Sequence, residues 1–138
     1  MKANDNIKVY IAREDDGSYS MYMDEKAEMP YGLVGEGDTV AAAVDEWTRA
    51  YEDMRKIFEE NGEEFPERTF TYVYDVPSFL RYYGGKLTFS GLSRITGVSA
   101  AQLSQYAGGY RNPSPKTTQK IQEALHAFAQ DLSQVQLV

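Results

Sequence analysis

The sequence predicts an α+β protein with two domains, residues 1–76 with strands and one helix and residues 77–132 with helices alone, followed by a tail, 133–138. Three patterns indicate this. Apolar and polar residues alternate in short segments early in the chain and again near residue 70, as in half-buried strands. Between these segments, apolar residues recur every three or four positions, the spacing of an amphipathic helix. Beyond residue 76, short helical segments are separated by glycine and serine, which end and begin helices.

The first strand is predicted at residues 7–13, where isoleucine and valine alternate with polar side chains. Asp16-Gly17 follows, a strong signal for a hairpin turn, and residues 18–23 alternate again as a second strand. A third, weaker strand is expected at residues 31–34. The last strand of this domain is predicted at residues 69–76, with three aromatic side chains on one face.

A long helix is predicted between the third and fourth strands. Asp38 is the expected N-cap, because its carboxylate can accept hydrogen bonds from free backbone N–H groups. Asn61-Gly62 supplies the left-handed stop. One face of this helix is expected to pack on the sheet, and its apolar residues are Val40, Ala43, Val44, Trp47, Tyr51, Met54 and Phe58.

The composition is that of a globular protein, with 138 residues of which 42% are hydrophobic and 25% charged. The absence of cysteine excludes disulfides and thiolate metal sites. No apolar run reaches the roughly 20 residues that span a bilayer, and Met1–Asn6 lacks the apolar core of a signal peptide. We therefore expect a cytoplasmic protein that has no membrane partner.

Charge is distributed unevenly between the two halves. Residues 1–75 contain eight basic and nineteen acidic side chains, a formal charge of −11, whereas residues 76–138 contain six and two, a charge of +4. Such asymmetry indicates two modules with different partners. Only the second module can approach phosphates without strong repulsion.

The first module resembles the N-terminal domain of HicB-type antitoxins from Ile7 to Tyr74. The segment Gly32–Thr39, followed by Ala41-Ala42-Ala43, carries most of the resemblance. The resemblance implies a βββαβ domain with a partial RNase H fold that lacks the catalytic apparatus.

An enzyme would need clustered functional groups. Asp15-Asp16 is expected to form the hairpin turn, and the glutamates at 59–64 are expected to lie in solvent at a helix end. A metal-dependent nuclease, which needs carboxylates that converge on a cation, is therefore the weaker hypothesis. His126, the one histidine, has no nucleophile and carboxylate arranged around it. We expect no catalytic residues, no metal and no cofactor.

The second module reads as a helix-turn-helix. A short helix begins near Pro77 and ends at Gly84-Gly85, and a second contains Leu92 and Ile95, three residues apart and facing a core. Gly97 can adopt the positive φ of a tight turn, and Val98 plugs that turn into the core. In the next helix Ser99 and Gln102 fit a capping box, Leu103 and Tyr106 point inward, and a last helix begins at Ser114-Pro115 with a core stripe of Ile121, Leu125 and Phe128.

The opposite face of the helix after Gly97 carries Ala101, Gln102 and Gln105, and a recognition helix places such a face in the major groove. Gln pairs with adenine in bidentate fashion, and alanine methyls contact thymine methyls. Arg94 could reach a phosphate. The helix start at Ser114-Pro115 offers free N–H groups to a phosphate.

Residues 87–132 resemble the lambda-repressor-like, XRE-type helix-turn-helix family. The resemblance is carried by Leu92, Gly97-Val98-Ser99, Leu103-Ser104-Gln105, Gly109, Arg111–Ser114 and the helix through Ile121 and Leu125. The resemblance implies two sets of contacts with operator DNA. Ala100 and Ala101 stand where polar residues are common in the family, so base readout is expected to be thin. The implied base contacts are Ala100, Ala101, Gln102 and Gln105, and the implied phosphate contacts are Arg111, Asn112, Lys116 and Thr117.

Together the two resemblances imply a HicB-type antitoxin with a helix-turn-helix. It would neutralise a small basic ribonuclease toxin of HicA type by occlusion and repress its own operon as a dimer or larger homo-oligomer. The charge of −11 independently suits a basic partner. The alternative is a stand-alone transcriptional regulator whose first domain senses a small molecule or only dimerises. One hypothesis for residues 133–138 is an intersubunit strand.

Overall fold

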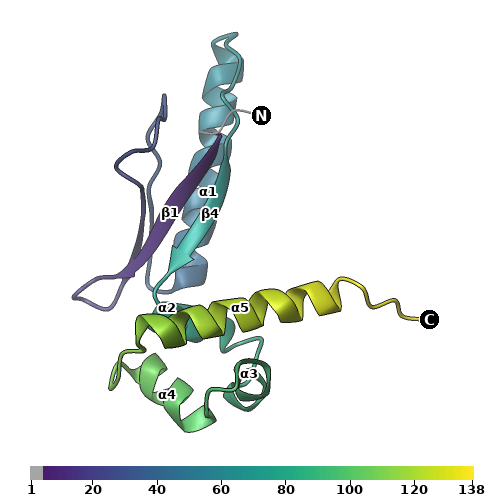
Figure 1. Ribbon diagram of the computed structural model, residues 1–138. Helices are drawn as coiled ribbons and strands as arrows, with labels where there is room; N and C mark the ends of the chain where they lie inside the picture. Colours follow the sequence, from purple (N-terminus) through teal and green to yellow (C-terminus); the bar gives the residue numbers. More distant parts are fainter. Residues whose placement is uncertain (1–4) are drawn as a thin grey trace. The chain divides into compact units, whose positions relative to one another are not determined.

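The computed structural model describes residues 5–138, which form four strands and five helices (Figure 1). The predicted α+β class is confirmed. The chain divides into two compact units, one ending at Ser78 and the other comprising Phe79–Val138. Residues 1–4, part of the start that the sequence predicts not to be a signal peptide, lie outside the described residues. Within residues 5–138, no helix is long and apolar enough to cross a membrane.

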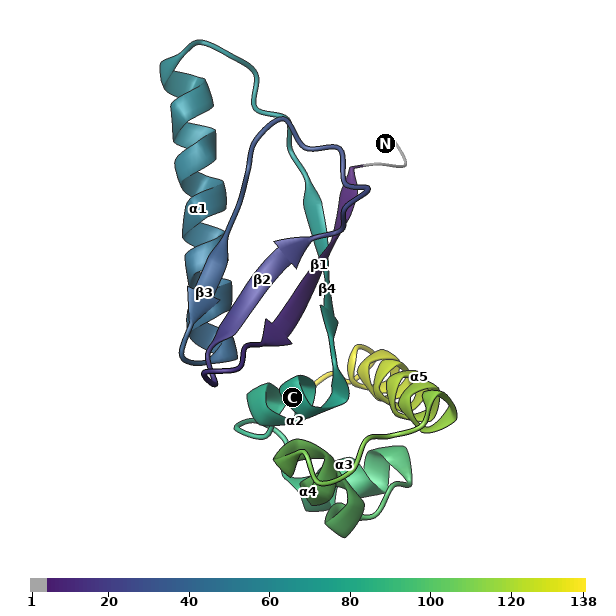
Figure 2. The same ribbon diagram turned by 90° about the vertical axis from the view of Figure 1, so that its left-hand side faces the viewer.

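One mixed sheet, with the strand order β3-β2-β1-β4, dominates the first unit (Figure 2). β1 (Asn6–Arg13) and β2 (Tyr19–Met23) are antiparallel neighbours. The turn between them contains Gly17 with φ of +87°, which glycine adopts at no steric cost. The hairpin predicted at Asp16-Gly17 is therefore confirmed.

α1 (Val40–Glu60) covers one face of the sheet, and β4 (Thr69–Tyr74) lies parallel to β1 at the sheet's edge. Trp47 of α1 is 1% exposed, and its ring lies 5.5 Å from that of Phe70 in an edge-to-face contact. This geometry is favourable for aromatic pairs. Trp47 is thus a core residue, as predicted, and it ties the helix to the edge strand.

Three local predictions for this unit are wrong. The strand predicted at residues 69–76 ends at Tyr74. The N-cap of α1 is Thr39 and not Asp38: Thr39 has the extended backbone that a cap requires, and its Oγ1 accepts a hydrogen bond from the Ala42 N–H at 3.1 Å. The third strand is β3 (Gly35–Gly37) and not residues 31–34.

The third strand is shifted because burial at 31–34 arises from side-chain packing and not from strand pairing. Tyr31 is buried against Phe65, with ring centres 5.1 Å apart. The pairing falls on glycine, since α1 passes very close: a Cβ on Gly35 would lie 2.7 Å from the Ala43 carbonyl oxygen. Glycine-rich sequence therefore marks the strand at this position.

The second unit is helical. α2 (Val76–Tyr83) begins before the boundary between the units, and it is followed by α3 (Phe89–Thr96), α4 (Ala100–Gly108) and α5 (Pro115–Leu132). Most of the side chains that the sequence predicts in the core of this unit are buried. Three others that were predicted to point inward, Ile95, Leu125 and Phe128, are only half-buried. The buried apolar residues of this unit are Leu80, Leu92, Val98, Leu103, Tyr106 and Ile121.

Candidate nucleic-acid interface

A three-residue turn joins α3 and α4. Gly97 ends α3 in the left-handed conformation, with φ of +76°, and its N–H donates to the Ser93 carbonyl at 2.8 Å. Val98 is 5% exposed. Ser99 then caps α4, its Oγ accepting a hydrogen bond from the Gln102 N–H at 3.1 Å. Each residue of the turn thus has one function: reversal of the chain, burial, and capping of the next helix.

Thr96, which the sequence analysis did not select, also fixes this turn. The residue is 2% exposed. Its hydroxyl donates to the Leu92 carbonyl at 2.8 Å and accepts from the Val98 N–H at 3.2 Å. Buried polar groups must find such partners, because an unpaired one costs about 1–3 kcal/mol. The threonine side chain therefore holds the last turn of α3 against the residue that plugs the core.

α4 has one buried and one exposed face. Leu103 and Tyr106 are 0% and 4% exposed, whereas Ala101 and Gln105 are exposed on the opposite side, as is Ala100 at the start of the helix. The result is a short polar helix face with small side chains at its N-terminal end and an amide one turn further on.

Gln102 differs from the other three residues predicted to contact bases, because it is half-buried. Its side-chain Oε1 accepts a hydrogen bond from Ser99 Oγ at 3.4 Å. In the predicted capping box this side chain would instead bond the backbone N–H of the cap residue. Ser99 thus caps α4 as predicted, but the Gln102 side chain bonds the Ser99 hydroxyl and not the Ser99 backbone N–H.

The four residues predicted to contact phosphate lie in the segment after α4 and at the start of α5. Arg111, Asn112 and Lys116 are exposed. Thr117 is half-buried, and the cap uses its polar atoms: its N–H donates to Ser114 Oγ at 3.1 Å, and its Oγ1 accepts from that hydroxyl at 3.0 Å. Three of the four predicted phosphate-contact side chains are therefore exposed, and the polar atoms of the fourth, Thr117, are engaged in capping α5.

Two basic residues missed by sequence reasoning approach the α3–α4 region from other helices. Arg81 of α2 donates its Nε–H to the Ala107 carbonyl at 2.8 Å, near the C-terminal end of α4, where carbonyls lack partners within the helix. Lys120 of α5 lies beside the α3–α4 turn, with Nζ 3.4 Å from the position that a Cβ would occupy on Gly97. Neither contact has a local sequence signal, since each joins residues more than twenty positions apart.

Three tyrosines of the second unit, Tyr82, Tyr83 and Tyr110, differ in their exposure. Tyr110 is 86% exposed and directly follows the glycine cap of α4, so it is not a core residue. Tyr82 and Tyr83 are half-buried in a cluster with Phe79, and Lys86 lies 5.4 Å from the ring centre of Tyr82. Tyr110 therefore joins Arg111 in the exposed segment after α4.

Several acidic residues of the first unit form local hydrogen bonds or ion pairs. Asp16 Oδ1 accepts hydrogen bonds from the Ser18 N–H at 2.9 Å and from Ser18 Oγ at 2.6 Å, and these bonds lower the pKa of the Asp16 carboxyl. Glu14 accepts a bond from Ser20 Oγ. Across residues 5–138, no three His, Asp or Glu side chains are grouped so that they could hold a metal ion.

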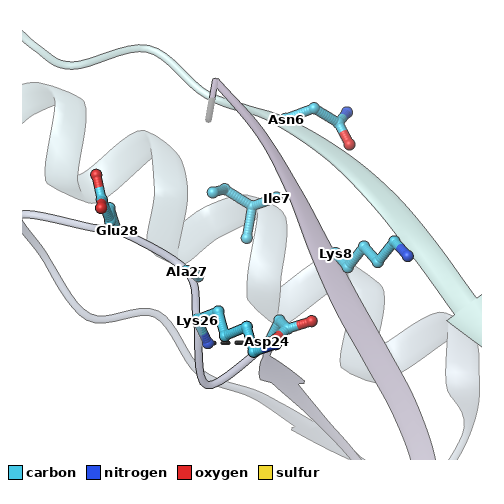
Figure 3. Close-up of a pocket in the computed structure, with 7 residues that line it drawn as sticks. All are labelled: Asn6, Ile7, Lys8, Asp24, Lys26, Ala27 and Glu28. Carbon is cyan, nitrogen blue, oxygen red and sulfur yellow. Dashed lines mark hydrogen bonds between the residues drawn. The ribbon is translucent and has the colours of Figure 1, made fainter. Parts of the chain in front are cut away.

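A depression of about 250 Å³ lies between the first residues of β1 and the segment after β2 (Figure 3). Ligand pockets are usually larger, about 300–1,000 Å³. Lys26 donates its backbone N–H to Asp24 Oδ1 at 3.0 Å, an Asx-type turn. Lys8 and Glu28 also line the depression but belong to separate segments. The arrangement is that of a surface loop with mixed charges and provides no converging set of reactive groups among its lining residues.

Comparisons of the chain with protein-family models, with curated proteins and with solved structures find no match.

Proposed function

We propose that this protein is a HicB-type antitoxin that binds operator DNA through α3 and α4 and neutralises a small basic ribonuclease through its first unit. The observation that carries the DNA-binding part is the orientation of α4. Burial of Leu103 and Tyr106 turns Ala101 and Gln105 to solvent. A short helix with this exposed face, held at its N-terminus by a glycine turn, is suited to the major groove.

In this proposal the two sets of residues in the second unit have distinct tasks. Phosphate contacts position the protein, whereas contacts to base edges select the sequence. Exposed Gln105 supplies the bidentate amide, and the alanines supply methyl contacts. The net charge of +4 in this half of the chain predicts modest, strongly salt-dependent affinity. The assigned base contacts are Ala100, Ala101, Gln102 and Gln105, and the phosphate contacts are Arg111, Asn112, Lys116 and Thr117.

The toxin-binding part rests on charge and on the family resemblance. The first 75 residues carry −11, and a surface of this charge attracts a basic protein and raises its association rate. Strand order and the single helix of the first unit are compatible with the partial RNase H-like domain that the resemblance implies. In this proposal the domain acts by covering the toxin's RNA-binding or catalytic surface and performs no chemistry.

The experiment is operator binding by a double variant, Gln105→Ala with Arg111→Ala, measured by fluorescence anisotropy on DNA from the promoter of the protein's own gene. Loss of a bidentate base contact and a phosphate contact should weaken binding by about 2–4 kcal/mol, or roughly 30- to 1,000-fold. The matched control is Gln122→Ala with Arg49→Ala, which removes the same residue types from exposed positions on α5 and α1. Equal affinities of the two double variants would refute the DNA-contact assignment.

The antitoxin role has a separate test. Co-expression with the product of the adjacent reading frame, expected to be a basic protein of roughly 60–90 residues, should restore growth that this product alone arrests. The Gln105→Ala, Arg111→Ala variant should restore growth equally well, because its first unit is unchanged. Operator binding without any neutralised neighbour would favour the alternative, a stand-alone regulator.

A further inference from the structure

β4 has an unpaired outer edge. It pairs only with β1, and the strand order β3-β2-β1-β4 leaves its other side without a neighbouring strand from the residues that the structure describes (Figure 2). The Thr69 N–H donates to the Asp5 carbonyl at 2.9 Å, on the β1 side. Backbone groups of successive residues in a strand point to alternate sides. Phe70 and Tyr72 therefore direct their N–H and C=O groups outward.

Most natural edge strands are protected by charges, proline, bulges or a short length. β4 has none of these protections: its six residues, Thr-Phe-Thr-Tyr-Val-Tyr, are all uncharged and favour strands. This is notable in a domain with 27 charged residues among its first 75. Tyr72, in the middle of the strand, is 37% exposed. An edge of this kind is a template for another strand.

We propose that the partner of this edge is β4 of a second copy of the chain, paired antiparallel around Tyr72, so that two sheets become one. The charges at the two ends of the strand favour a second, antiparallel copy of β4 as the partner. Arg68 precedes β4 and Asp75 follows it. Antiparallel pairing brings the basic end of one strand beside the acidic end of the other at both ends, whereas parallel pairing brings like charges together.

The neighbouring acid does not cancel this complementarity. Glu67 forms a salt bridge with Arg55 of α1, and that side chain also donates a second hydrogen bond to it at 3.0 Å. Glu67 is therefore already neutralised within its own chain. Arg68 and Asp75, in contrast, form hydrogen bonds with neutral backbone groups: Arg68 Nη1 donates to the Glu67 carbonyl at 2.9 Å, and Asp75 Oδ1 accepts from the Ser78 N–H at 2.7 Å.

Backbone geometry fixes the register. In an antiparallel pair, two residues that both direct their backbone groups toward the partner strand exchange two hydrogen bonds. A two-fold axis at Tyr72 satisfies this condition, placing Tyr72 opposite Tyr72 and Phe70 opposite Tyr74 of the second copy. Cross-strand aromatic pairs of this type stabilise sheet pairing. Thr71 would lie opposite Val73 and not opposite itself.

Because the chain contains no cysteine, single cysteines can test this register in the full-length protein. Tyr72→Cys should form an intermolecular disulfide under mild oxidation, because directly opposite Cα atoms lie about 5.5 Å apart, within disulfide range. Thr71→Cys is the matched control, adjacent and exposed but facing a different residue. We expect Tyr72→Cys to cross-link at least tenfold faster. Equal rates, or no cross-link at either position, would overturn the proposal.

Charge variants provide a second measurement that does not depend on oxidation. Tyr72→Lys and Tyr72→Glu each place like charges face to face across the axis, and sedimentation equilibrium should show half the wild-type mass for each variant alone. An equimolar mixture should recover the wild-type mass, because lysine then faces glutamate. Circular dichroism checks that each variant is folded. A Tyr72→Lys protein that keeps the wild-type mass, or a mixture that fails to recover it, would exclude this interface.

Discussion

Leu103→Ala tests the geometry on which the DNA-binding proposal depends, the inward orientation of one face of α4. Leu103 is 0% exposed and lies one helical turn from the capping residue Ser99. Truncation of a buried leucine costs about 2–5 kcal/mol, because the cavity is only partly filled by relaxation. The second unit has 60 residues, and native domains have roughly 0.05–0.15 kcal/mol of stability per residue. The variant should therefore lose a large fraction of the roughly 3–9 kcal/mol that the unit has.

The assay follows the two units separately in one sample. Thermal unfolding by circular dichroism reports on all helices, whereas fluorescence reports on Trp47, the single tryptophan, which lies in the first unit. A loss of 2 kcal/mol corresponds to roughly 8–16 °C in the melting temperature of a domain this size. The dichroism transition of the second unit should shift by this amount or more while the fluorescence transition stays in place.

Gln105→Ala is the matched substitution for this experiment, since it lies on the same helix two residues away but is exposed. Surface substitutions usually change stability by less than about 0.5 kcal/mol. Gln105→Ala should therefore melt like the wild type while it weakens operator binding. A Leu103→Ala protein that melts like the wild type, or a Gln105→Ala protein that does not, would show that α4 faces the other way.

Three further predictions follow from single contacts. Trp47→Ala should lower the free energy of unfolding of the first unit by about 3–5 kcal/mol in urea titrations, and an unchanged midpoint would show that its contact with Phe70 contributes little. Gly97→Ala should destabilise the second unit by about 1–2 kcal/mol, because residue 97 has a positive φ that alanine adopts poorly. Gly97→Asn should destabilise the unit less, since asparagine tolerates this region, and equal losses of stability in the two variants would rule out backbone strain as the cause. Hydrogen bonding to Arg55 lowers the pKa of Glu67, so its stabilisation is complete above the unfolded value of about 4.3 and is lost as the pH falls through the lower folded value. Wild type should thus lose more stability than Glu67→Gln between about pH 5 and pH 3, and parallel curves would contradict the assignment.

Local sequence signals predicted the α3–α4 turn well because each of its requirements belongs to one residue type. Only glycine adopts φ of +76° easily, and a serine before an apolar run is a common cap. The position of Thr96 had no such signal, since a threonine at a helix end is compatible with exposure. Its burial follows from the approach of Val98, which local sequence does not encode.

The errors in the first unit have a related cause. Asp38 and Thr39 are both good cap residues, and the choice between them depends on which backbone is extended where β3 meets α1. Tyr31, in the segment predicted as a strand, is instead buried by side-chain packing, and its partners Phe58 and Phe65 come from segments more than 25 residues away. Contacts of this length, like that between Arg81 and Ala107, follow from the fold and not from a local pattern.

β4 is a further element whose existence the sequence predicts but whose neighbours it does not. Its position in the sheet determines which edge is open to a second copy of the chain. Alternation predicted a strand there, but an alternating pattern is the same for a central and an edge strand. The structure settles the position: the chain crosses from β3 through α1 and returns beside β1, in parallel, so no later strand of the described chain covers Tyr72. An uncharged edge with opposite charges at its ends is self-complementary only when the two strands are antiparallel. The charge-swap pair at Tyr72 therefore tests orientation and register together, because a parallel or shifted pairing would not bring the two substituted side chains face to face.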